Sequence, residues 1–307
     1  MTIASLLKSS KSAYKGERAN LVCEILLAHF LGKERVFLHA NSERKIQGIL
    51  DSNESTSSLR DSTQRVELWQ STNDLLPQDE FTLHSKLLES VSRLNNGYPL
   101  EYITKKVSFY GMDFFIDEGA LIPRPETEIL VDKATQIIKS HNIQQIYEIG
   151  TGSGIIAITL CLQNPHIQIT ATDISPTALQ IAQKNIALKS ALDSTLKSRI
   201  RLICADLLQG ADFVPKNSLI ISNPPYIAED YALPKNVAYE PKIALFGGKN
   251  GDEILRKIIA LNADFLCCEI GHNQGYLADF LGAYKSVEFY KDYAGFTRGF
   301  VASAFVF

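Results

Sequence analysis

The alternation of short apolar runs with longer amphipathic segments after residue 145 constrains the fold of this chain most strongly. Each apolar run has the length of a buried strand, and each amphipathic segment has the length of a helix. Strands that alternate with helices form a doubly wound, mostly parallel sheet. The sequence therefore predicts an α/β domain with a seven-stranded sheet. We expect strands at residues 145–149, 167–172, 200–204, 219–222 and 265–270 with two more in the tail to Phe307, and helices at 155–163, 176–189, 252–262 and 276–283.

The region before this sheet repeats its apolar residues at helical spacing. Residues 21–30 carry one apolar stripe, and residues 87–94 carry another. Between them, residues 51–73 are rich in Ser, Thr, Asn and Gln, and we expect a loop or a weak helix there. The only tryptophan, Trp69, lies in this segment, and we expect it to be a packing anchor rather than a partner contact. We predict a small helical bundle domain over residues 1–97 that binds the substrate or braces the rest of the chain.

Residues 98–120 change to the pattern of a β-hairpin, which would link the bundle to the domain over residues 121–307. After the hairpin, Pro125 suits the first turn of a helix that would run to about His141. The residues around Arg124 fit an interdomain connection, but this side chain is also a candidate to face a site.

The charge of the chain argues against long nucleic acid as its main ligand. The formal net charge is −3; residues 1–92 hold 11 Lys and Arg against 12 Asp and Glu, and the remainder holds 20 against 22. The five cysteines form no CxxC pair, and we expect buried free thiols in a reducing cytoplasm. The six histidines lack metal-ligand spacing, so we expect no metal. We also expect no signal peptide and no membrane span.

A glycine-rich turn follows the first strand of the predicted sheet. Glycines at such a turn let the backbone approach a ligand, with N–H groups at the start of the next helix. The spacing is GxGxG, whereas the dinucleotide fingerprint would require glycine where Ile155 stands, which argues against NAD. The candidate cofactor-binding residues of this turn are Gly150, Thr151, Gly152, Ser153 and Gly154.

Acidic residues follow the next two predicted strands. Asp173 can accept hydrogen bonds from ribose hydroxyls, although a role in capping the next helix fits it as well. Asp206 can accept a hydrogen bond from an adenine amino group while Leu207 packs on the ring. Ligands of open α/β sheets bind at the carboxyl ends of the strands, so we expect these residues to share one cofactor site.

The fourth predicted strand ends in the sequence Asn223-Pro224-Pro225-Tyr226. Two consecutive prolines make a rigid corner without formal charge. The Asn223 side-chain oxygen and a proline carbonyl can each accept one N–H of a planar –NH2 group, and Tyr226 can lie against its flat face. Alone, this stretch fits a plain tight turn equally well. Together with the three features before it, it predicts a site that holds an amide or an exocyclic amine.

Residues 121–307 resemble class I S-adenosylmethionine-dependent methyltransferases, and Asn223-Pro224-Pro225-Tyr226 matches the NPPY motif of enzymes that methylate planar nitrogen. Further segments resemble the release factor glutamine methyltransferase family, and the resemblance covers nearly the whole chain. It departs at residues 51–73, which are longer here, and at Leu207, where some relatives have an aromatic residue. The segments that carry this resemblance are residues 108–111, 121–128, 240–241, 244–248, 269–271 and 274–275.

The resemblance implies transfer of a methyl group from S-adenosylmethionine to N5 of the glutamine in the Gly-Gly-Gln motif of class-1 peptide-chain release factors. It implies that Asn223, Pro224, Pro225 and Tyr226 are catalytic and bind the substrate, with Phe109 and Arg124 beside them. Asn223 would also touch the cofactor. We expect a cytoplasmic monomer. The alternatives are a glutamine methyltransferase of a ribosomal protein, an amino-methyltransferase of RNA or DNA, and a non-catalytic binding module with the same fold.

Overall fold

The computed structural model describes residues 1–51, 77 and 79–306, which divide into two compact units, Met1–Thr104 and Lys105–Phe307. The described part of the first unit is helical, as predicted, and α1 packs against α2 and α6. The expected polar segment lies, from residue 52 on, outside the described residues, as does Trp69. The helices are α1 (Ile3–Ala13), α2 (Ala19–Leu31), α3 (Arg35–Ala40), α4 (Ile46–Asp51), α6 (Glu80–Asn95) and α7 (Leu100–Thr104).

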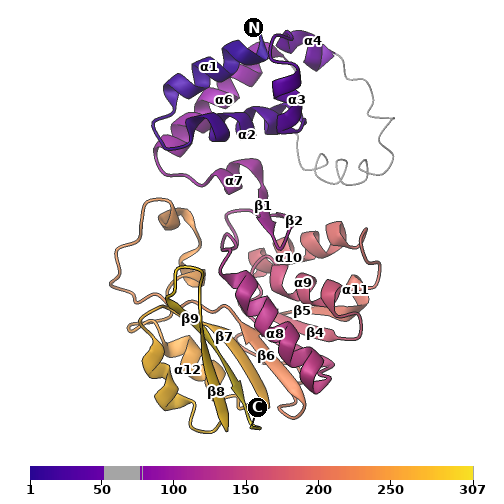
Figure 1. The fold of residues 1–307 in the computed structure, drawn as a ribbon, viewed down its shortest axis with the longest axis vertical. Coiled ribbons are helices and arrows are strands. Elements are labelled where there is room, and N and C mark those ends of the chain that lie inside the picture. Colours follow the sequence, from indigo (N-terminus) through magenta and orange to yellow (C-terminus); the bar gives the residue numbers. More distant parts are fainter. Residues whose placement is uncertain (52–76, 78, 307) are drawn as a thin grey trace. The chain divides into compact units, whose positions relative to one another are not determined.

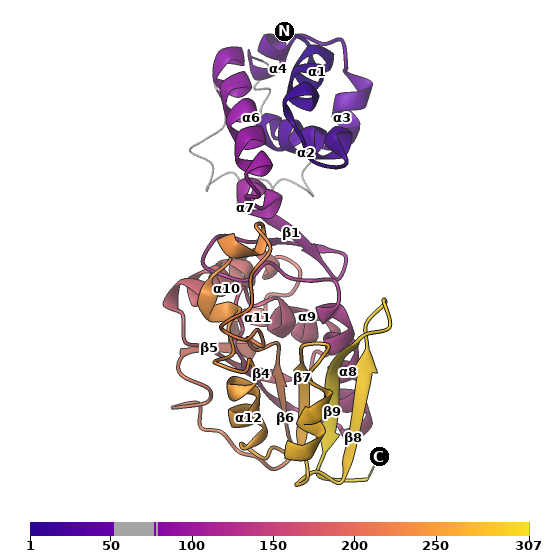
Figure 2. The ribbon, with the colours of Figure 1, turned by 90° about the vertical axis from the view of Figure 1, so that its left-hand side faces the viewer.

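The second unit contains a seven-stranded sheet in the order β5-β4-β3-β6-β7-β9-β8, which confirms the predicted α/β fold (Figures 1 and 2). Strands β3 to β7 are parallel, and β9 is antiparallel to its neighbours β7 and β8. The strands are β3 (Gln145–Ile149), β4 (Gln168–Asp173), β5 (Ile200–Cys204), β6 (Ser218–Ser222), β7 (Phe265–Glu269), β8 (Ser286–Lys291) and β9 (Thr297–Ser303).

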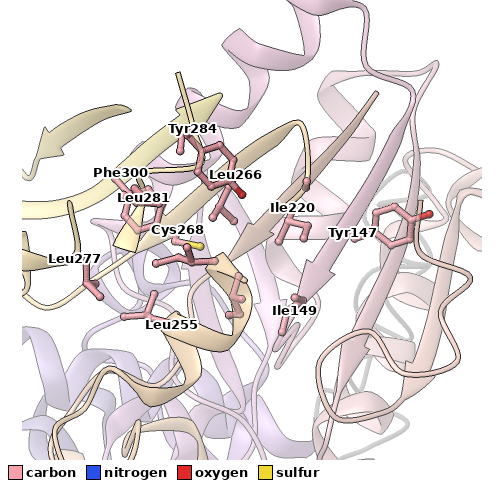
Figure 3. Packing of buried hydrophobic residues seen from close by; sticks show 14 of the residues in the cluster. Tyr147, Ile149, Ile220, Leu255, Leu266, Cys268, Leu277, Leu281, Tyr284 and Phe300 are labelled. Carbon is pink, nitrogen blue, oxygen red and sulfur yellow. The ribbon is translucent and has the colours of Figure 1, made fainter. Parts of the chain in front are cut away.

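Helices cover both faces of this sheet because its central strands are apolar on both sides. The adjacent residues Cys267 and Cys268 illustrate the alternation: the Cys267 thiol faces the carbonyl of Leu130 in α8, whereas Cys268 belongs to the core cluster with α12 (Figure 3). The helices are α8 (Thr127–His141), α9 (Ile155–Gln163), α10 (Pro176–Lys189), α11 (Leu196–Arg199) and α12 (Glu253–Ile259), with 3-10 turns η1 (Val237–Tyr239), η2 (Lys242–Ala244) and η3 (Gly275–Phe280). None of the described helices is long and apolar enough to cross a bilayer.

The predicted hairpin is present but shorter than expected. Strands β1 (Lys106–Phe109) and β2 (Met112–Phe115) pair in an antiparallel two-stranded sheet within the second unit. The preceding residues form helix α7 instead of strand, and Pro99, which suits a helix start, stands directly before it. Over so short a segment, the apolar side chains fit the spacing of a helix as well as that of a strand, so the sequence pattern does not distinguish the two structures.

Other differences concern segment ends and one cysteine. The helix expected at 276–283 is the 3-10 turn η3, and α12 is shorter at both ends than residues 252–262. Cys204 is exposed, so the expectation that all five thiols are buried is wrong. This residue ends β5, the edge strand of the sheet, where only one neighbouring strand covers it.

Candidate active site

The carboxyl ends of β3, β4, β5 and β6 border one cleft in the second unit. Ile149 pairs with Thr172 on one side and with Ser222 on the other, so the loops after these strands leave the sheet together. The cleft is open to solvent and encloses about 1190 Å³ when its mouth is included. Of the predicted site residues, it is lined by Gly150, Thr151, Gly152, Ser153, Asp173, Asp206, Leu207, Asn223, Pro224 and Pro225.

The glycine turn forms a cradle that only glycine fits well. Gly150, Gly152 and Gly154 have φ values of 71°, 56° and 78°, a region that favours glycine. A Cβ at Gly150 or Gly152 would project into open space, whereas one at Gly154 would lie 3.0 Å from the Cβ of Ala182 in α10. Gly154 therefore does not line the cleft but lets α10 pack closely behind the turn. The first two glycines leave room for a ligand against the backbone.

Asp173 holds the glycine turn from the end of β4. Its Oδ2 accepts the N–H of Gly152 at 2.8 Å, and its Oδ1 accepts the N–H of Ser175 at 2.8 Å. Burial raises the pKa of this carboxyl group, while the N–H donors oppose that rise. A carboxylate oxygen has more than one lone pair, so acceptor capacity remains for the hydroxyls of a ribose. The N-cap of α10 is Ser175, whose hydroxyl accepts the N–H of Ala178, so Asp173 holds the turn without capping the helix itself.

Asp206 and Leu207 follow β5, the neighbour of β4, and line the same cleft. Asp206 is exposed. Leu207 has a φ of 50° and packs against the core cluster while it lines the cleft. An apolar side chain beside an acceptor fits the flat ring and the amino group of adenine.

Glu148 lies beneath the glycine turn and was not singled out as a site residue from the sequence. It is fully buried, and its Oε2 accepts the Thr151 hydroxyl at 2.8 Å. Its Oε1 has no hydrogen-bond partner among the described residues. Burial raises the pKa of this carboxyl group to about 8.

We expect the free energy of unfolding to decrease as pH rises from 4.5 to about 8 because of Glu148. The folded state keeps the proton up to the raised pKa, whereas the unfolded chain releases it near the ordinary value, so rising pH favours unfolding. Glu148→Gln should make this slope shallower in urea unfolding followed at several pH values, with the part that Glu269 contributes below about pH 7 remaining. Glu43→Gln, at an exposed position, should leave it unchanged. An equally steep slope in Glu148→Gln would show that other groups cause it.

Asn223 is held at the end of β6 by the start of α8. Its Nδ2 donates to the Thr127 hydroxyl oxygen at 3.2 Å, and that hydroxyl donates to Glu269 Oε2 at 2.8 Å. No described residue donates to Asn223 Oδ1. The amide group is therefore fixed on its NH2 side and has a free acceptor on the other.

A glycine-rich segment packs behind the two prolines. A Cβ at Gly247 would lie 2.4 Å from the Pro225 carbonyl oxygen, and one at Gly251 would lie 2.5 Å from that of Tyr226. Gln274 Nε2 also donates to the Tyr226 carbonyl at 3.2 Å. The carbonyls of Pro225 and Tyr226 are thus enclosed by backbone, which leaves that of Pro224 as the candidate second acceptor for a substrate amide.

Three predicted substrate residues do not line the cleft. The Tyr226 hydroxyl donates to Glu269 Oε1 at 3.2 Å, and burial raises its pKa. Phe109 is only 1% exposed and packs edge-on against Phe114. Arg124 pairs with Oε1 of the buried Glu240.

Several side chains that shape the site were missed as functional residues in the sequence. Glu240 also accepts the N–H of Ile122 at 2.9 Å, so it joins two segments at the cleft mouth. Asn185 bonds to both backbone groups of Phe115 and, at 2.8 Å, to the Ser153 carbonyl, which ties the hairpin to the glycine turn. The sequence holds one indication of the role of Glu269. This carboxylate ends an otherwise apolar strand, and burying a carboxylate is costly unless it has partners or a function.

Comparison with known proteins agrees with this geometry. The family model for the methyltransferase small domain matches residues 127–240. The catalytic domain of hMettl16, solved in complex with a MAT2A 3′UTR hairpin, is similar in fold, with a TM-score of 0.51 and 16% identity over 73% of this chain and 82% of that one. The sheet, the cleft and the family model define a class I methyltransferase that uses S-adenosylmethionine.

Curated relatives identify the family within this class. A release factor glutamine methyltransferase of Chlorobaculum tepidum is 32% identical over 97% of this chain and 96% of the relative. Those of Moorella thermoacetica and Clostridium acetobutylicum are 36% and 30% identical over 70% and 85% of this chain, and 78% and 79% of their own lengths. The chain belongs to the release factor glutamine methyltransferase family, which confirms the predicted resemblance.

Proposed function

We propose that this protein methylates N5 of the glutamine in the Gly-Gly-Gln motif of class-1 peptide-chain release factors. The observation that carries the proposal is the Asn223 corner: Thr127 holds the NH2 side of its amide, no described residue donates to its oxygen, and Asn223 and Pro224 both line the cleft. Two acceptors in a rigid frame match the two N–H donors of a primary amide. Family membership supports a release factor as the protein that carries this amide.

The main contribution that this reaction requires from the protein is correct placement of the substrate amide nitrogen. An amide nitrogen is a weak nucleophile because its lone pair is delocalised into the carbonyl. S-adenosylmethionine supplies an electrophilic sulfonium methyl group when it is bound. In-line placement of the nitrogen can then contribute on the order of 7–11 kcal/mol in ideal cases. Acceptors on both N–H groups also stabilise the positive charge that develops on nitrogen. The extra proton can leave after transfer, when the nitrogen is far more acidic, so we assign no general base.

The remaining predicted roles form part of the proposal. We propose that Gly150, Thr151, Gly152, Ser153 and Asp173 hold the cofactor, and that Gly154 contributes by letting α10 pack behind the turn. Asp206, Leu207 and Asn223 would complete the site. Pro225 and Tyr226 would complete the catalytic substrate corner, with the Tyr226 ring against the flat face of the amide. Phe109 and Arg124 remain candidates for the substrate side, Phe109 through the hairpin and Arg124 through its pairing with Glu240.

At the level of the whole chain, the division into residues 1–97, 98–120 and 121–307 also stays a prediction, with the helical domain binding the release factor. We further propose a cytoplasmic monomer that takes a protein substrate, without long nucleic acid or a membrane. The near balance of charge in both parts of the sequence supports this choice of partner.

Mass spectrometry of the Gly-Gly-Gln peptide tests the proposal. Purified release factor is incubated with the protein and S-adenosylmethionine, and we expect one methyl group on the glutamine side chain. An unmodified peptide, together with methyl transfer to a ribosomal protein or to RNA or DNA, would overturn the substrate assignment. Absence of cofactor binding would overturn the methyltransferase assignment itself.

A further inference from the structure

We propose that Thr127 and Glu269 are positioning residues that fix the orientation of the Asn223 amide, so that its oxygen and not its NH2 group meets the substrate. The inference rests on the proposed function and deepens it. It assigns a role to a buried series of hydrogen bonds beside the cleft, which runs from Glu269 through Thr127 to Asn223. We call this series the relay.

The relay joins three elements that are distant in sequence. Glu269 ends β7, Thr127 begins α8 and Asn223 follows β6. Glu269 and Thr127 are 1% and 2% exposed, so water does not compete for their bonds. The contacts are 2.8 Å between Glu269 Oε2 and Thr127 Oγ1, and 3.2 Å between Thr127 Oγ1 and Asn223 Nδ2.

The direction of these bonds follows from what each group can donate. An ionised carboxylate only accepts, so Glu269 requires the Thr127 hydroxyl to donate to it. The hydroxyl has a single proton, and its oxygen can then only accept from Asn223. The Asn223 side chain must accordingly present its NH2 group to Thr127. Its carbonyl oxygen is thereby directed away from Thr127, as the gripping of a substrate N–H requires.

The surroundings of Glu269 allow the relay to respond to pH. Thr127 and Tyr226 donate to its two oxygens, the guanidinium of Arg298 attracts its negative charge, and Glu126 repels it. Burial outweighs the favourable contacts and raises its pKa to about 7. A protonated Glu269 can donate to Thr127, whose hydroxyl is then free to donate to Asn223 Oδ1. With the hydrogen bonds of the relay reversed in this way, Asn223 Oδ1 would be bonded to Thr127 and would no longer be available to a substrate N–H.

The matched pair Thr127→Val and Thr127→Ser tests the relay. Valine keeps the shape of the side chain but removes the hydroxyl, whereas serine keeps the hydroxyl. We expect kcat on release factor to fall on the order of 10- to 100-fold in Thr127→Val, with cofactor affinity within about threefold of the parent protein. Thr127→Ser should retain most of the activity. A kcat in Thr127→Val within about threefold of the parent protein would overturn the proposal.

The pH profile separates positioning from simple structural support. In the parent protein and in Thr127→Ser, kcat at saturating substrates should fall as pH drops through about 7, because Glu269 gains its proton there. In Thr127→Val this acid limb should vanish, since Glu269 no longer acts on Asn223. An unchanged acid limb in Thr127→Val would show that the relay does not carry the effect.

Nuclear magnetic resonance gives a readout that does not depend on the substrate assignment. The carboxyl carbon of Glu269 and the side-chain NH2 of Asn223 should titrate together in the parent protein and in Thr127→Ser. In Thr127→Val the Asn223 signal should no longer follow Glu269. If release factor stays unmodified while the two signals are coupled, the relay stands and only the proposed substrate fails; uncoupled signals in the parent protein would overturn the relay.

Discussion

Asn223→Ala is expected to lose nearly all methyl transfer while the protein still binds its cofactor. The substitution removes the one side-chain oxygen at the corner that is free to accept a substrate N–H, and it leaves Thr127 without its partner. Removal of a comparable preorganised polar group in other enzymes costs about 10²–10³ in kcat, and we expect a loss of at least that size. Cofactor affinity, measured by titration calorimetry, should stay within a few fold because the glycine turn and Asp173 are untouched.

Asn223→Gln is the matched control for this experiment. It restores the amide group but moves it by one methylene, so it separates the presence of an acceptor from its placement. We expect activity close to that of Asn223→Ala, since Gln cannot keep both the Thr127 bond and the position of the oxygen. A large loss of cofactor affinity in Asn223→Ala would instead mark Asn223 as mainly a cofactor residue.

The arrangement of the site along the sheet was predictable because parallel topology brings strand ends together. The glycine turn, Asp206 and Asn223 follow β3, β5 and β6, and Asp173 ends β4. The register of β3 with β4 and β6, and of β4 with β5, places them on one edge. The apolar runs gave these strands to within one residue at each end, because a strand buried on both faces is apolar throughout. Fold and candidate ligand-binding edge therefore followed from local sequence alone.

The side chains that orient the site were not predictable in the same way. Thr127 and Glu269 are 142 positions apart, and Arg124 and Glu240 are 116 apart. Neither pair has a periodicity or a motif that joins its members, and their meeting depends on how α8 and the loop after β6 pack on the sheet. Tyr226 is an example. Its aromatic ring led to the prediction that it lies against the substrate amide, but the hydrogen bond of its hydroxyl to Glu269 could not be predicted, because only the folded chain brings the two residues together.

The two acidic residues predicted for the cofactor site should differ strongly in their contribution to binding. Asp173 is partly buried and holds the glycine turn, whereas Asp206 lies exposed on the rim. A hydrogen bond to a charged group contributes about 1.5–3 kcal/mol, so Asp173→Ala should weaken cofactor affinity roughly 10- to 150-fold for each ribose bond lost. Water screens the exposed carboxylate, so Asp206→Ala should stay within about fivefold. Titration calorimetry with S-adenosylmethionine measures both.

Asp173→Asn separates cofactor contact from support of the turn. It keeps one side-chain oxygen, which can still accept an N–H of Gly152 or Ser175, but it loses the charge and one acceptor. We expect a melting temperature closer to that of the parent protein than in Asp173→Ala, with most of the affinity loss retained. Equal losses of cofactor affinity in Asp173→Ala and Asp206→Ala would contradict this prediction. Such a result would mean that water screens the contact of the cofactor with Asp173 as much as its contact with the exposed Asp206.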